Sequence, residues 1–165
     1  MTEDSGASPN EILLGGARQG NPELIQEALA EGADIGHRDG LGATALHYAA
    51  GTLSFDALKA LLESPGLTQD LINVRENVTG EAAIHRAAAA WDRDPEVALE
   101  TLALLVDKGA DVTLTDRQGS RPIARLPPQG AQEARTLFQQ AALAKTLGAG
   151  QEDSDSEGEA SSEED

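Results

Sequence analysis

The 165-residue sequence contains no cysteine, which excludes a disulfide framework and a thiolate metal site. It also has no apolar run that approaches the roughly 20 residues of a membrane-spanning helix. Its start, MTEDSGASPN, lacks the basic and apolar regions of a secretory signal. We therefore expect a protein of the cytoplasm, the nucleus or both, with no membrane association.

Basic residues are scarce beside acidic ones, and the formal net charge is -17 at pH 7. This charge repels phosphates and anionic lipids, so it argues against direct binding to nucleic acid or membranes and favours a basic protein partner. Residues 151–165 hold eight acidic residues and no basic one. They contain too little apolar surface to fold, so we expect 148–165 to be a disordered acidic tail and 1–8 a flexible N-terminus.

Aromatic residues are nearly absent: Tyr48, Phe55, Trp91 and Phe138 are the only ones. Alanine and leucine dominate instead and recur at helical spacing, which predicts closely packed helices. The length suits one domain with a modest core.

Two segments repeat within the chain. The sequence EGADI at residues 31–35 recurs as KGADV at 108–112, and each copy closes an amphipathic helix. The sequence GATALHYAA at 42–50 recurs as GEAAIHRAA at 80–88, and a degenerate copy opens at Gly119. Gly32 and Gly109 stand where a helix end requires the left-handed conformation.

These segments resemble the ankyrin repeat, a 33-residue pair of helices with a projecting turn and a TPLHxA signature. The resemblance implies an all-α ankyrin-repeat solenoid over residues 9–147, with repeats at about 9–38, 39–76, 77–115 and 116–147. The outer repeats lack the signature histidine, as capping repeats often do. Insertions at 64–73 and near 91–95 are expected to form loops, and residues 131–147 a longer closing helix.

The sequence offers little chemistry. His47 and His85 occupy equivalent repeat positions, so we interpret them as histidines that hydrogen-bond across neighbouring turns, and His37 as a solvated loop residue. The sequence has no nucleophile elbow, phosphate-binding loop, zinc-protease motif or calcium loop. We expect a monomer that binds another protein, with no catalysis, cofactor or metal.

Partners of ankyrin proteins usually contact the projecting turns and the exposed side of the first helix. For any single one of these positions, a solvated turn residue is the better explanation, so the hypothesis concerns the row as a whole. Trp91 is a further candidate, either as a binding hot spot or as a side chain packed over helix ends. The resemblance thus predicts these partner-binding residues: Arg18, Gln19, Gly40, Leu41, Ala43, Gly51, Thr52, Val78, Thr79, Glu81, Ala89, Ala90, Trp91, Arg117, Gln118 and Ser120.

Four tail serines have an acidic residue three positions on, which is typical of acidophilic kinase sites: Ser154, Ser156, Ser161 and Ser162. A repeat stack with an acidic tail resembles the small ankyrin-type chaperones of ribosomal proteins. This implies an escort chaperone for a basic protein. The alternative is an inhibitory or scaffolding ankyrin adaptor in signalling or transcription, whose tail governs turnover or solubility.

Overall fold

The computed structural model describes residues 6–156, with side chains to residue 148, and this part of the chain contains helices but no strand. The prediction of an all-α ankyrin-repeat solenoid is confirmed. The helices are α1 (Pro9–Gln19), α2 (Pro22–Ala30), α3 (Ala45–Gly51), α4 (Phe55–Leu62), α5 (Gln69–Ile72), α6 (Ala83–Ala89), α7 (Pro95–Asp107) and α8 (Gln132–Ser156), with 3₁₀ turns η1 (Trp91–Arg93) and η2 (Pro122–Arg125).

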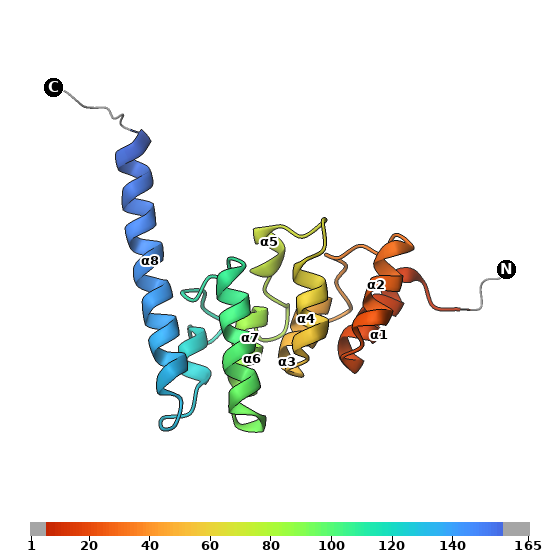
Figure 1. The fold of residues 1–165 in the computed structure, drawn as a ribbon, viewed down its shortest axis with the longest axis horizontal. Coiled ribbons are helices and arrows are strands. Elements are labelled where there is room, and N and C mark those ends of the chain that lie inside the picture. The colour runs from red at the N-terminus through yellow and green to blue at the C-terminus, as the bar shows by residue number, and fades with distance from the viewer. Residues whose placement is uncertain (1–5, 157–165) are drawn as a thin grey trace.

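The elements stack in two rows along one axis (Figure 1). The inner row is α1, α3, α6 and η2, and the outer row is α2, α4, α7 and α8; each element contacts the next one in its row. The projecting turns line up beside the inner row, because the Asn77 N–H donates to the Leu41 carbonyl and the Arg117 N–H to that of Thr79, both at 2.8 Å. Neighbouring repeats therefore contact each other both through their helices and through hydrogen bonds between their turns.

Local sequence fixes where the helices begin. Ser8 caps α1: its hydroxyl accepts from the Glu11 N–H at 3.2 Å, while the Glu11 carboxylate accepts from the Ser8 N–H at 2.9 Å. Asn21 caps α2 and Asp94 caps α7 through the cap side chain alone, which accepts from the Leu24 and Val97 N–H groups respectively, and each cap is followed by proline at the first helical position.

The core lies between the rows and is built from leucine and alanine. Leu46 and Ile84 of the inner row face Leu58 and Leu102 of the outer row, and all four side chains are at most 1 % exposed. Burying each such side chain contributes roughly 1.5–3 kcal/mol. Fully buried alanines on α3 and α6 let the inner helices approach closely, which explains the alanine-rich composition.

Three regions differ from the expected outline. The insertion at 64–73 forms helix α5, whose Ile72 joins the core, and the insertion near 91–95 forms η1 and the start of α7. Helix α8 continues to Ser156, past the predicted boundary at residue 147. The stretch has no proline to end the helix, although Gly148 and Gly150 are poor helix formers. Residues 1–5 and 157–165, which complete the predicted tails, lie outside the described residues.

Candidate protein-binding face

Each projecting turn is closed by an acidic side chain at its base. One carboxylate oxygen of Asp116 accepts the backbone N–H groups of Gln118 and Ser120, both at 2.9 Å. One oxygen of Glu76 accepts the Gly80 N–H at 2.8 Å. The carboxylates therefore organise the turn backbones. The three turn acids are Asp39, Glu76 and Asp116.

The turn acids are held in their charged form. Burial raises the pKa of Glu76, but hydrogen bonds from its own turn and the charge of Arg86 outweigh burial, so the pKa is lowered. The hydrogen bond from the Ser120 N–H lowers the pKa of Asp116 most, burial opposes it, and Arg125 lowers it further. Both groups are thus carboxylates at neutral pH.

The residue that follows each histidine position contacts the turn acid of its own repeat. Glu81 lies between two such residues, 3.6 Å from the Arg86 guanidinium and 2.9 Å from that of Arg125. The guanidinium of Arg18 stacks on the Tyr48 ring, 4.4 Å from its centroid. The three repeated pairs are Tyr48 with Asp39, Arg86 with Glu76, and Arg125 with Asp116.

In the repeated arginine pairs the carboxylate lies inside and the guanidinium outside. The side chain of Glu76 is 2 % exposed and that of its partner Arg86 23 %. Asp116 is fully buried, whereas Arg125 is 29 % exposed. A ligand that approaches the inner row therefore meets guanidinium groups before carboxylates.

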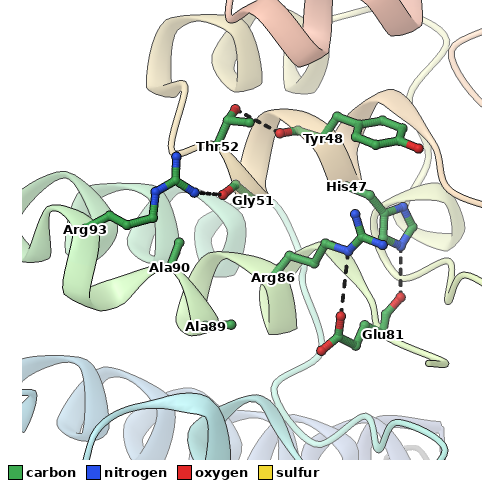
Figure 2. Close-up of a pocket in the computed structure, with 9 residues that line it drawn as sticks. All are labelled: His47, Tyr48, Gly51, Thr52, Glu81, Arg86, Ala89, Ala90 and Arg93. Atoms are coloured by element: carbon green, nitrogen blue, oxygen red, sulfur yellow. Dashed lines mark hydrogen bonds and ion pairs between the residues drawn. The ribbon is translucent and has the colours of Figure 1, made fainter. Parts of the chain in front are cut away.

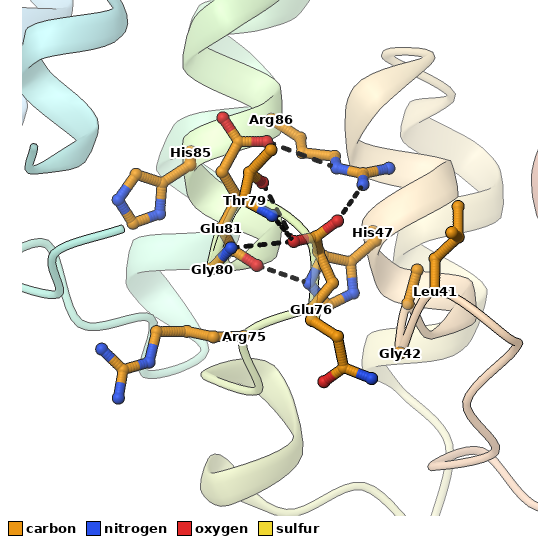
Figure 3. A network of polar contacts seen from close by, with 12 residues as sticks. Leu41, Gly42, His47, Arg75, Glu76, Thr79, Gly80, Glu81, His85 and Arg86 are labelled. Carbon is orange, nitrogen blue, oxygen red and sulfur yellow. Dashed lines mark hydrogen bonds and ion pairs between the residues drawn. The ribbon is translucent and has the colours of Figure 1, made fainter. Parts of the chain in front are cut away.

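Two histidines connect successive repeats, as the sequence predicted. His47 Nε2 lies 2.9 Å from the Glu81 carbonyl, and His85 Nε2 lies 3.1 Å from that of Ser120. The Thr44 N–H donates to His47 Nδ1 at 3.0 Å, so the ring proton is on Nε2. Burial lowers the pKa of His47 to about 4, so the ring is neutral at pH 7. Figure 3 shows the His47 ring bonded to Glu81 beside the Glu76–Arg86 pair.

A groove of about 390 Å³ opens between α3 and α6 on the inner row. Figure 2 shows Gly51 and Thr52 on one wall, Ala89 and Ala90 on the other, and Arg93 across one end, where its Nη1 donates to the Gly51 carbonyl at 2.7 Å. His47, Tyr48, Glu81 and Arg86 complete the lining. We call this nine-residue surface the inner groove.

Most of the predicted partner-binding residues are accessible. Five of them line the inner groove: Gly51, Thr52, Glu81, Ala89 and Ala90. Ser120 is half-buried in its turn. The exposed ones are Arg18, Gln19, Gly40, Leu41, Val78, Thr79, Ala89, Arg117 and Gln118. Leu41 and Val78 are 51 % and 58 % exposed, so adjacent turn tips carry apolar side chains.

Two predicted contact residues are too deep to touch a partner. Ala43 is fully buried because it leads directly into α3 beneath the turn. Trp91 is only 5 % exposed and belongs to the hydrophobic core, so it packs over the helix ends rather than forming a surface hot spot. Ala90 lines the inner groove but is itself only 6 % exposed, because its neighbours cover most of it.

Sequence reasoning missed the row of arginines on the inner face. Arg86, Arg93 and Arg125 were not among the predicted contact residues. The available signal was periodic: an acid eight or nine residues before each histidine position, and an arginine or tyrosine directly after it.

The predicted phosphorylation serines lie at or beyond the end of the described residues. Ser154 and Ser156 lie in the last turns of α8, and Ser161 and Ser162 lie outside the described residues. Within residues 6–156, no three histidine or acidic side chains are grouped to hold a metal ion. No helix in the same range is long and apolar enough to span a membrane.

Comparison with known proteins gives consistent matches. A family model described as ankyrin repeats (3 copies) matches residues 13–116. Diacylglycerol kinase zeta of Rattus norvegicus is 32 % identical over 122 residues, which cover 74 % of this chain and 12 % of the kinase. Human diacylglycerol kinase iota is 30 % identical over 103 residues, covering 62 % of this chain and 9 % of the kinase. The chain thus spans about a tenth of the kinases it matches.

A match of similar length comes from yeast. The ankyrin repeat-containing protein YGL242C of Saccharomyces cerevisiae is 27 % identical over 164 residues, covering 92 % of this chain and 89 % of the relative. The family match ends at residue 116, where the fourth predicted repeat begins. This repeat has a 3₁₀ turn in place of its first helix and lacks the histidine.

Proposed function

The chain belongs to the ankyrin-repeat family, and from this premise we propose that it holds a segment of a partner protein in the inner groove. The main support for this proposal is that several residues of the groove walls have small side chains. Gly51, Ala89 and Ala90 are small, so about 390 Å³ stays open between α3 and α6 beside the longer lining side chains of Arg86 and Arg93. A partner backbone can therefore come close to two helices of adjacent repeats, which is how solenoids present binding surfaces.

The test compares two alanine-to-leucine changes on exposed helix positions. Ala89→Leu fills the inner groove, whereas Ala103→Leu adds the same volume on outer helix α7. Partners are captured from extract with the full chain, identified by mass spectrometry, and their affinities are measured with purified protein. We expect Ala89→Leu to weaken binding at least tenfold and Ala103→Leu to leave it unchanged. Equal effects would contradict the proposal.

An escort chaperone for a basic protein, such as a ribosomal protein, is a second candidate. The outer helices favour it, because α2, α4 and α7 together carry six acidic residues and one lysine. A basic client would lie against these helices and the acidic residues of 151–165. Capture of a highly basic protein that is lost in salt, or from a chain ending at Gly150, supports this candidate. If the captured partners are neutral and bind equally well to the chain ending at Gly150, an inhibitory or scaffolding adaptor is favoured.

We propose further that the chain acts as a monomer without catalysis, in the cytoplasm or nucleus. The support is a repeat stack whose sequence has no recognised catalytic motif. Light scattering at micromolar concentration tests the monomer, and imaging of the tagged full-length protein tests the location. A dimer mass or an organelle-bound signal would overturn the corresponding part.

A further inference from the structure

Charge differs between the two rows for most of the described helices. The exceptions are η1, which holds Asp92 beside Arg93, and α8, whose described side chains include Glu133, Arg135 and Lys145. The inner elements α1, α3, α6 and η2 carry three arginines and one acid, Glu11. The outer helices α2, α4 and α7 show the reverse balance. Opposing charges are screened beyond roughly 8–10 Å at physiological salt. The inner face therefore acts on a ligand through its own arginines rather than through the net charge of the chain.

The arginines around the inner groove retain donors that point away from the core. A guanidinium has five N–H donors, and Arg93 uses one of them on the Gly51 carbonyl. Arg93 is exposed and makes no ion pair within the described residues. Arg86 contacts Glu76 and Glu81 from the groove wall, and both carboxylates are less exposed than the arginine.

Further arginines lie on the turns beside the inner row, where Arg75 and Arg117 line a second pocket with Glu76 and Asp116. Arg38 donates to the Arg75 carbonyl at 2.6 Å, Arg75 to that of Thr115 at 3.0 Å, and Arg117 to that of Asn77 at 2.9 Å. Each of these bonds reaches a neutral backbone oxygen of a neighbouring turn, so it fixes the arginine without cancelling its charge. The turns beside the inner row thus hold these three arginines in fixed positions.

We propose that the segment held in the inner groove is acidic, with Asp or Glu side chains that pair with Arg93 and Arg86. This inference rests on the function proposed above and adds the chemistry of the partner segment. Carboxylate and guanidinium groups form charge-assisted, often bidentate hydrogen bonds, which are about twice as strong as neutral ones. A basic segment would be repelled by these arginines. An acidic segment would be attracted by them, and Glu81 would keep its ion pairs with Arg86 and Arg125.

The test is a selection from a random library of displayed 12-residue peptides on the full chain. We expect the selected peptides to be rich in Asp and Glu. In anisotropy titrations, a synthetic selected peptide should bind Arg93→Gln about tenfold more weakly than the wild type, and its Gln/Asn-substituted version should lose binding equally. Lys59→Gln, on outer helix α4, is the matched control and should bind as the wild type. Circular dichroism and Trp91 fluorescence verify the fold of each variant.

The outcomes separate the two proposals. Selected peptides that are neutral or basic, or acidic peptides that bind Arg93→Gln unchanged, overturn the acidic-segment inference. If such peptides still lose binding in Ala89→Leu, the inner groove remains the binding surface. Peptides that bind equally to wild type, Arg93→Gln and Ala89→Leu overturn both.

Discussion

The middle of the stack and its C-terminal end are built from the same unit but are held together differently. In the middle, α3 and α6 each have neighbours on both sides and a buried histidine bonded to the following turn. At the end, η2 has exposed Ala124 at the histidine position. Helix α8 packs through Phe138, which is 2 % exposed, but Leu143 and Leu147 are 59 % and 58 % exposed. A repeat thus takes its stability from having two neighbours.

The largest test of this difference is a pair of leucine truncations. Leu102→Ala, at a fully buried position of α7, should destabilise the protein by about 2.5–5 kcal/mol through lost transfer energy and the cavity. Leu143→Ala in α8 should cost less than about 0.5 kcal/mol, because its side chain is largely in water. Urea unfolding followed by circular dichroism measures both. Similar losses would show that α8 is as integral as α7.

The next test is the pH dependence of stability, which should reflect the buried histidines of the middle repeats. Burial lowers the pKa of His47 to about 4, so the unfolded chain binds a proton at higher pH than the folded one. Stability should therefore fall as pH drops from about 6.5 to 4, by roughly 3 kcal/mol for His47. Burial lowers the pKa of His85 too, which adds to the same trend.

The carboxylates lose their contribution only at lower pH. The pKa of Glu76 is lowered by bonds that outweigh burial, so protonation removes its stabilisation below about pH 4. Urea unfolding at several pH values distinguishes the groups: His47→Gln should flatten the slope between pH 6.5 and 4, whereas His37→Gln should preserve it. The part of the slope due to His85 should remain, and a slope left unchanged by His47→Gln would assign the acid sensitivity to groups other than His47.

The smallest effect is expected at the end of the stack. Lys145 pairs with Asp111 at 2.7 Å and is 55 % exposed, and such surface pairs contribute at most about 1 kcal/mol. Lys145→Ala should speed amide hydrogen exchange in α8 beyond Ala142 and leave α3 and α6 unchanged. Lys108→Ala, at the end of α7, is the control without this pair. Faster exchange throughout the chain would mean that α8 stabilises the whole stack.

The parts of the fold that follow from the repeat were predictable. The spacing of His47 and His85 indicated their role because a repeat fixes the neighbour that each ring meets. Gly80 was part of the same motif, and the structure gives the reason: its φ is +76° and a Cβ there would lie 2.9 Å from the Arg117 nitrogen.

The parts that depend on side-chain burial at irregular positions were not predictable. Trp91 lies in an insertion, where no period tells whether the side chain turns inward, and the core takes it because the ring offers a large apolar area. The candidate groove was anticipated in its small residues but not in its arginines. The net charge of the chain gave no sign of them, since composition does not report where on the fold the basic residues lie.

The histidine bonds also bear on how the chain is made. The acceptor of His47 lies 34 residues later in the sequence, and that of His85 lies 35 residues later. During synthesis on the ribosome, the histidine of each of these repeats can form its hydrogen bond only after the turn of the next repeat has emerged. Assembly can therefore proceed in the order of translation, one unit at a time, without waiting for the far end of the chain.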